Sequence, residues 1–132
     1  DAIVDVATLT GAVVMALSSV AAGIMGNDDR TVNKWKNAAT ETEERYVELP
    51  IFPEYTEDMK SKIADLKNIG SDRGAGCQKG GAFLKEFIRK GNKWVHVDVA
   101  GTAWSSGKLP YDPANGGSGH TVRTLVQFAR TL

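Results

Sequence analysis

The chain has 132 residues, a length typical of one domain, and 42% of them are hydrophobic, enough for a globular core. Its 16 basic and 16 acidic residues balance, which gives no long-range attraction to nucleic acid or to an anionic membrane. The longest apolar stretch, residues 11–26, is interrupted by serines and glycines and is too short to cross a bilayer.

The first predicted element is a strand over residues 2–9, a β-branched run typical of a strand covered on both faces. The chain starts inside this hydrophobic run without a Met, and we therefore expect the domain to have begun upstream. Thr10 is predicted to cap a buried helix over residues 11–21, and a second strand of small residues is predicted over 21–27.

A second helix is predicted over residues 30–46, with Val32, Trp35 and Ala39 at helical spacing. Asn27, Asp28 and Asp29 are candidate caps for it. Pro50 and Pro53 are expected to break any element around them. Beyond them, one or two helical turns are predicted from the spacing of Tyr55, Met59, Ile63 and Leu66, and residues 71–81 read as a glycine-rich basic loop.

The remaining elements are a helix over residues 81–91, a strand over 94–100, a long loop over 105–119 and a helix over 120–132. This alternation of strands and helices predicts an α/β sheet with helices on its faces. The expected apolar stripes are Phe83, Leu84, Phe87 and Ile88 in the first helix and Val122, Leu125, Val126 and Ala129 in the second. In the strand, Val95, Val97 and Val99 face one way, and Trp94, His96 and Asp98 face the other.

The sequence contains few candidate catalytic or metal-binding side chains. His96 and Asp98 share one strand face and are the best local candidates for metal ligands. A half-buried pair held by hydrogen bonds to neighbouring helices is the favoured explanation, because no third ligand is nearby. Ser105 and Ser106 lack the glycine-flanked turn of a nucleophilic serine that would pair with His96 or His120. Cys77 lies near Arg73 and Lys79, whose charges favour a thiolate, yet no partner base is identifiable, and an unreactive cysteine is favoured.

Two predicted strands end in small residues, "ATLTGA" at 7–12 and "AGTAW" at 100–104. In an open α/β sheet, ligands bind beyond the carboxyl ends of strands, where exposed backbone groups can bind an extended peptide. Close packing of a helix on the sheet accounts for the same residues. An anion cradle at Thr10 and Gly11 is a weaker hypothesis, because the glycine spacing of a phosphate loop is absent.

Several blocks in one order resemble the leucyl aminopeptidase family: "DVATLTGA" at 5–12, "ADLKNIG" at 64–70, "AFLKEF" at 82–87, "HVDVAGTAW" at 96–104 and "RTLVQFA" at 123–129. The resemblance spans essentially the whole chain. It implies a three-layer α/β/α sandwich with a mixed sheet, of which residues 1–132 are the C-terminal portion of the catalytic domain. It also implies a cytoplasmic protein that assembles as a homo-hexamer.

The resemblance implies release of an N-terminal amino acid, such as leucine, from peptide substrates. Two divalent cations (zinc, manganese, magnesium or cobalt) activate a water in this family, with a bicarbonate held by an arginine as the base. The ligand-bearing "NTDAEGR" segment is absent from residues 1–132. We therefore assign no metal ligand and no catalytic residue to this chain, treat Asp5, His96 and Asp98 as structural, and expect the isolated chain to be inactive.

By the same resemblance, the carbonyl of Leu9 and the amide of Gly11 hold the substrate backbone. Thr8, Ala100 and Ala103 line the pocket for the first side chain, and Ile69 lines the next pocket. The chain departs from the family pattern "AGAxTAAxFL" with "AGCQKGGAFL", in which Lys79 and Gly80 replace small residues. Because of this departure, either the start of that helix or the packing beside the pocket is expected to differ from the family pattern.

A second hypothesis is a non-catalytic module, such as a truncated paralogue of the family retained for assembly. The coding sequence upstream of residue 1 separates the two, because an "NTDAEGR"-like segment supports the enzyme. A small nucleotide-binding domain that uses Thr10 and Gly11 ranks third and requires stabilisation by phosphate.

Overall fold

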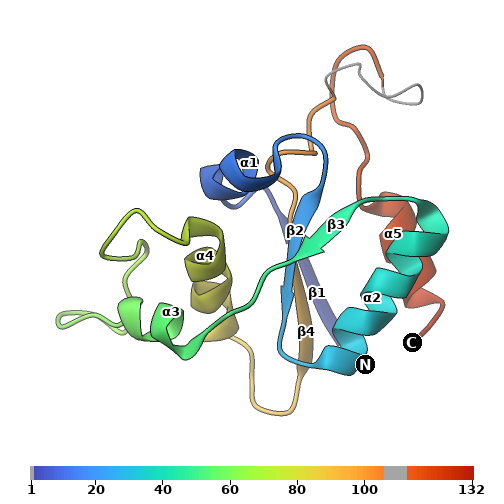
Figure 1. The fold of residues 1–132 in the computed structure, drawn as a ribbon. Coiled ribbons are helices and arrows are strands. Elements are labelled where there is room, and N and C mark those ends of the chain that lie inside the picture. Colours follow the sequence, from blue (N-terminus) through green and yellow to red (C-terminus); the bar gives the residue numbers. More distant parts are fainter. Residues whose placement is uncertain (1, 106–112) are drawn as a thin grey trace.

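The computed structural model describes residues 2–105 and 113–132, and these form a mixed four-stranded sheet with helices on both faces (Figure 1). The strand order is β1-β4-β2-β3. The strands are β1 (Ala2–Ala7), β2 (Ala22–Gly26), β3 (Tyr46–Glu48) and β4 (Lys93–Asp98). β1 runs parallel to β4 and β3 runs parallel to β2, whereas β2 and β4 are antiparallel. The predicted α/β class and mixed sheet are confirmed.

One face of the sheet is covered by α2 (Asp29–Thr42) and α5 (Val122–Ala129), which pack against each other. The larger apolar core lies here, where Trp35 of α2 and Phe128 of α5 meet with ring centroids 5.3 Å apart. Strand residues complete this core: Ala22, Ile24, Val95 and Val97. Burying side chains of this size is the main stabilising contribution of the layer.

The opposite face is covered by α1 (Gly11–Leu17) and α4 (Gly76–Lys85), and the short α3 (Pro53–Asp58) lies beside α4 (Figure 1). Its apolar core is smaller and is built on Val13, Met25 and Cys77. The sandwich therefore has unequal layers, and the thinner one lies over the strand ends that the sequence singles out.

Local sequence explains where the first helices begin. Thr10 is extended and its hydroxyl accepts a hydrogen bond from the Val13 amide at 3.1 Å, as predicted for the cap of α1. Asp28 caps α2 in the same way through the Thr31 amide at 2.8 Å. α1 ends at Leu17, before the predicted residue 21, because Ser18 takes a positive φ of 57°.

Several expectations are corrected by the structure. β1 is not covered on both faces, because it lies at an edge of the described sheet and leaves Ile3 and Val6 partly exposed. Residues 43–46 leave α2, and Tyr46 starts a strand that the sequence analysis missed. The helical spacing over residues 55–66 stops with α3, and Ile63 is 98% exposed.

Three further corrections concern α4 and α5. Residues 76–81 are helical rather than loop, because α4 begins at Gly76. Its buried face is made of small residues and Lys79, while Phe87 lies beyond the helix and is exposed. In α5 the core-facing residues are Thr124 and Phe128, whereas the predicted Val122 and Val126 are exposed. None of the described helices has the length and apolarity that a membrane crossing requires.

Candidate functional site

The parallel strands β1 and β4 end side by side at one edge of the sheet. The Val99 amide donates to the Ala7 carbonyl at 2.9 Å, which extends the pairing of the strands to their last residues. Residues 8–11 follow β1 and residues 100–103 follow β4. The two small-residue stretches that the sequence analysis singled out are therefore neighbours in space, at the position where α/β sheets bind ligands. We call residues 8–11 the strand-end turn.

The carboxylate of Asp98 holds the strand-end turn in place. It is fully buried, and it accepts hydrogen bonds from the amides of Leu9 at 3.1 Å and Ala100 at 3.2 Å. Its second oxygen accepts from the Thr10 hydroxyl at 2.7 Å. One carboxylate thus joins the backbones that follow the two strands. Hydrogen bonds to a charged acceptor are stronger than neutral ones, and the turn is correspondingly well fixed.

Small residues bring neighbouring backbones close to the turn. A Cβ atom on Gly101 would lie 2.0 Å from the Ser18 carbonyl oxygen, so only glycine lets the end of β4 pass the end of α1. A Cβ on Gly80 would lie 3.0 Å from a methyl of Leu9. α4 therefore packs directly against the strand-end turn, and Gly80, which departs from the family pattern, preserves this contact.

The outer side of the turn is accessible. Leu9 is 38% exposed, and a Cβ on Gly11 would meet no atom within 4 Å. Gly11 is the first residue of α1, and the first amides of a helix have no partner within the helix. The turn thus has a main-chain donor, the Gly11 amide, next to open space, and binding of an extended peptide uses main-chain groups of this kind.

The other predicted site residues are placed differently. Ala100 packs on the smaller core around Val13 and Met25, whereas Ala103 packs on the larger core of the opposite layer. Ile69 belongs to the segment between α3 and α4 and is 80% exposed. The structure therefore brings Thr8, Leu9, Gly11 and Ala100 together. Ala103 is partly buried against the larger core, and Ile69 lies on a separate segment.

His96 and Asp98 do not form the pair that the sequence analysis considered. His96 is fully buried, and its Nδ1 donates to the carboxylate of Asp5 on the neighbouring β1 at 2.5 Å. The same carboxylate accepts from the Trp94 indole at 2.6 Å. His96 thus connects β4 to β1. Asp98 connects β4 to the turn after β1 and, through the Cys77 thiol at 3.7 Å, to α4, so the predicted hydrogen bonding to a neighbouring helix is confirmed for Asp98. This assignment of the Nδ1 proton follows from the carboxylate partner.

The described residues do not fit a metal ion. The Nε2 atom of His96 is buried and has no hydrogen-bond partner within the described ranges, and an imidazole oriented by a carboxylate is a common metal ligand. However, no group of three or more His, Cys, Asp or Glu side chains in residues 2–105 and 113–132 is arranged to hold an ion. A single imidazole does not make a metal site.

The candidate nucleophiles have other partners. Burial, together with the nearby Asp98 carboxylate, raises the pKa of the Cys77 thiol to about 12, so the activated cysteine considered from its basic neighbours is excluded. Ser105 donates to the Pro113 carbonyl at 2.5 Å. His120 Nδ1 lies 3.2 Å from both the Thr102 and the Thr121 hydroxyls. Ser106 lies outside the described residues.

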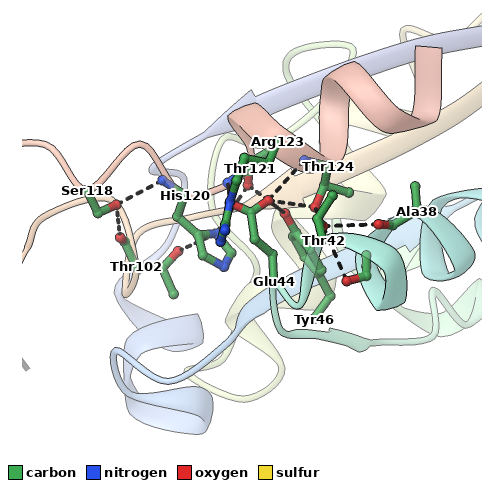
Figure 2. Close-up of polar contacts among 11 residues, drawn as sticks. Ala38, Thr42, Glu44, Tyr46, Thr102, Ser118, His120, Thr121, Arg123 and Thr124 are labelled. Carbon is green, nitrogen blue, oxygen red and sulfur yellow. Dashed lines mark hydrogen bonds and ion pairs between the residues drawn. The ribbon is translucent and has the colours of Figure 1, made fainter. Parts of the chain in front are cut away.

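A second buried carboxylate, Glu44, anchors the last helix (Figure 2). It accepts from the amides of Thr121 at 3.0 Å and Thr124 at 3.1 Å, and from the Thr124 hydroxyl at 2.6 Å. These amides open α5, so Glu44 caps that helix from a distant part of the chain. Burial alone would raise the pKa of Glu44, but these hydrogen bonds outweigh it and the pKa is lowered.

An open groove of about 1390 Å³ lies beside this anchor, between the end of α2, β3 and the start of α5. Exposed apolar side chains line it, among them Val20, Trp104 and Val122. None of the six predicted site residues does so. The predicted substrate residues and this groove are therefore different places on the molecule.

Sequence reasoning treated Asp98 as structural without finding its partners. Its role was visible in part, because an acidic residue in a run of valines must be hydrogen-bonded when buried. What the sequence did not show is that residues 9 and 10, far along the chain, supply the donors. Glu44 gave no signal at all, since it follows two other glutamates, Glu41 and Glu43, which are exposed.

Comparison with known proteins places this site in a family. The chain matches the catalytic-domain model of the cytosol aminopeptidase family over residues 1–126. It is 48% identical to a probable cytosol aminopeptidase of Geobacter sp. (strain M21) over 129 residues, which are 98% of the chain and 26% of that relative. It is also 48% identical to the one of Alkaliphilus oremlandii (strain OhILAs), over 98% of the chain and 26% of that protein.

Among solved structures, a mutant of tomato leucine aminopeptidase superposes with a TM-score of 0.88 at 36% identity, over 98% of this chain and 24% of that one. The chain thus spans about a quarter of the length of the curated relatives and of this structure.

Proposed function

Because the chain belongs to the cytosol aminopeptidase family, we propose that the protein containing it is a metal-dependent aminopeptidase that releases N-terminal residues such as leucine from peptides. Residues 1–132 form the C-terminal portion of its catalytic domain and supply part of the substrate pocket. The observation that carries the proposal is the strand-end turn, whose backbone is fixed by Asp98 and faces open space.

In this proposal the turn binds the peptide through its main chain. The Leu9 carbonyl and the Gly11 amide hold the substrate backbone on the leaving side of the cut, as a strand edge holds an added strand. Thr8, Ala100 and Ala103 contact the first side chain, and Ile69 contacts the next one. Burying a leucine side chain contributes about 1.5–3 kcal/mol to binding. Asp98 fixes the geometry without touching the substrate.

The chemical step belongs to the rest of the protein. Two divalent ions, manganese or zinc, and a bicarbonate would supply the activated water and polarise the carbonyl when bound. Within the described ranges no acidic or histidine cluster fits such ions. In this proposal the residues of this chain bind and orient the substrate, and we expect the isolated chain to be inactive. We further propose that this protein is a cytoplasmic hexamer. The relatives are named cytosol aminopeptidases, which supports the cytoplasmic location but not the hexamer.

The test is hydrolysis of leucinamide by the protein that contains this chain, loaded with Mn²⁺ or Zn²⁺. The proposal predicts turnover that a chelator abolishes and that added metal restores, and it predicts no turnover by residues 1–132 alone. Metal-independent turnover would contradict it. No hydrolysis of any leucyl peptide by the metal-loaded protein would favour the non-catalytic module.

A further inference from the structure

Lys79 is buried in the second turn of α4, with 6% of its surface exposed. Lysine is seldom buried unless its charge is paired. Its ammonium lies 2.8 Å from a carboxylate oxygen of Asp58 and 2.6 Å from one of Asp72. The hydrogen bonds that Lys79 donates to Asp58 and Asp72 raise the pKa of its ammonium, which therefore remains charged. This lysine stands where the family pattern has a small residue.

The two aspartates bracket one segment of the chain. Asp58 ends α3, Asp72 precedes α4, and between them the described chain has one isolated bridge, from Lys60 to Leu66. Regular hydrogen bonding between strands or within a helix therefore does little to hold this segment. The ammonium of Lys79 joins the two ends of this segment through its ion pairs with Asp58 and Asp72. These ion pairs hold the segment where regular secondary structure does not.

Asp58 also organises the interior of the segment. Its two carboxylate oxygens accept from the Ser71 amide at 3.1 and 3.0 Å. The Lys67 ammonium donates to the Asp58 carbonyl at 2.9 Å and to the Ser71 hydroxyl at 2.6 Å. A Cβ on Gly70 would lie 2.6 Å from the Lys79 side-chain carbon Cδ, so Gly70 packs on the stem of this lysine. Ile69 immediately precedes Gly70, and Lys79 thereby fixes the position of Ile69.

The same helix contacts the strand-end turn. Gly80 follows Lys79 directly and packs on Leu9, and a Cβ on Gly76 would lie 2.9 Å from the Ala12 side chain. Gly76 and Gly80 of α4 thus pack against the start of α1 and the strand-end turn. Lys79, on the same helix, holds the segment that contains Ile69. A helix is rigid over one turn, so α4 sets the position of Ile69 relative to Leu9 and Gly11.

We propose that Lys79 is a positioning residue for substrate specificity: through Asp58 and Asp72 it holds the Ile69 wall of the pocket that receives the side chain after the scissile bond. The inference rests on the proposed function. It implies that losing the Lys79 charge impairs the cleavage of peptides with a large second residue more than the cleavage of substrates without one.

The experiment compares leucyl-phenylalanine with leucinamide, which lacks a second side chain, in the metal-loaded protein containing this chain. Lys79→Met keeps the apolar stem and removes the charge. Lys85→Met, in the last turn of the same helix, is the matched control because Lys85 makes no ion pair with Asp58 or Asp72. We expect kcat/KM for leucyl-phenylalanine to fall about tenfold in Lys79→Met, mainly through KM, with leucinamide changing less than about twofold. Lys85→Met should leave both unchanged.

Equal losses on both substrates, or no loss, would overturn the positioning role. Hydrogen exchange of the backbone amides in residues 58–72 is the second readout. It should accelerate in Lys79→Met and not in Lys85→Met. Unchanged exchange in Lys79→Met would show that Lys79 does not stabilise this segment. Failure of the unmodified protein to cleave either substrate would instead refute the proposed function, and this inference with it.

Discussion

The buried carboxylate of Asp98 accepts a hydrogen bond from the amide of Leu9 at 3.1 Å, across 89 positions of sequence. This contact joins the end of β4 to the turn after β1. It gives this backbone donor a charged acceptor and fixes the turn beside the open space at Gly11. We propose that this fixed turn is the surface that binds the peptide.

Replacing Asp98 by Ala should destabilise the chain strongly. The substitution leaves the Leu9 and Ala100 amides and the Thr10 hydroxyl without their acceptor, and each unsatisfied buried donor costs about 1–3 kcal/mol. We expect the free energy of unfolding of the 132-residue chain, measured in urea, to fall by at least about 3 kcal/mol. Asp65→Ala, on an exposed loop, is the control and should change it by less than about 0.5 kcal/mol. A similar small change in both variants would disprove the role of Asp98.

Replacing Glu44 by Gln tests the distant cap of α5. Gln keeps the size of the side chain but turns one acceptor oxygen into a donor that faces the Thr121 or Thr124 amide. The expected cost is about 1–3 kcal/mol of unfolding free energy. The exposed neighbour Glu43 offers the matched substitution, Glu43→Gln, which should cost almost nothing. Equal stability of the two variants would rule out the cap.

The ion pairs of Lys79 predict a specific dependence of stability on acid pH. Hydrogen bonds from Lys79 and Ser71 lower the pKa of Asp58 from 3.8 to about 2. A carboxyl whose pKa is lowered by folding contributes stability above its ordinary pKa and loses it as the pH falls through the folded value. The stability advantage of the unmodified chain over Lys79→Met should therefore be full above about pH 4 and shrink toward pH 2. Urea unfolding at a series of pH values measures it, and a constant difference from pH 6 to pH 2 would contradict the pairing.

The sequence predicted the elements whose signals are local. β4 alternates valines with polar residues, and Thr10 and Asp28 are caps of a common type, so these strand and helix boundaries were accessible. β3 was missed because three residues carry no periodicity, and Tyr46 continues the helical pattern of α2. The start of α4 was missed because its glycines favour a loop by composition, although they serve to bring the helix against Leu9 and Ala12.

Of the candidate site, the proximity of the two strand ends was predictable, because parallel strands end at the same edge of a sheet. The partners of the charged residues were not. Asp98, Glu44 and Lys79 each contact residues that are remote in sequence or separated by irregular chain, and no spacing rule encodes such contacts. The apolar stripe of α5 failed for a related reason: Thr124 is buried only because Glu44 lies opposite to receive its hydroxyl.

The central claim is that the backbone of the strand-end turn binds the peptide, and Gly11→Pro tests it most directly. Proline at the first position of a helix is well tolerated, and Thr10 before it is extended, as a residue before proline must be, so the substitution removes the Gly11 amide donor while α1 persists. Gly11→Ala keeps the donor and is the control. In the metal-loaded protein containing this chain, we predict that kcat/KM for leucyl-phenylalanine falls between about twofold and tenfold in Gly11→Pro relative to Gly11→Ala. Equal kcat/KM in the two variants, with α1 intact by hydrogen exchange, would contradict the account.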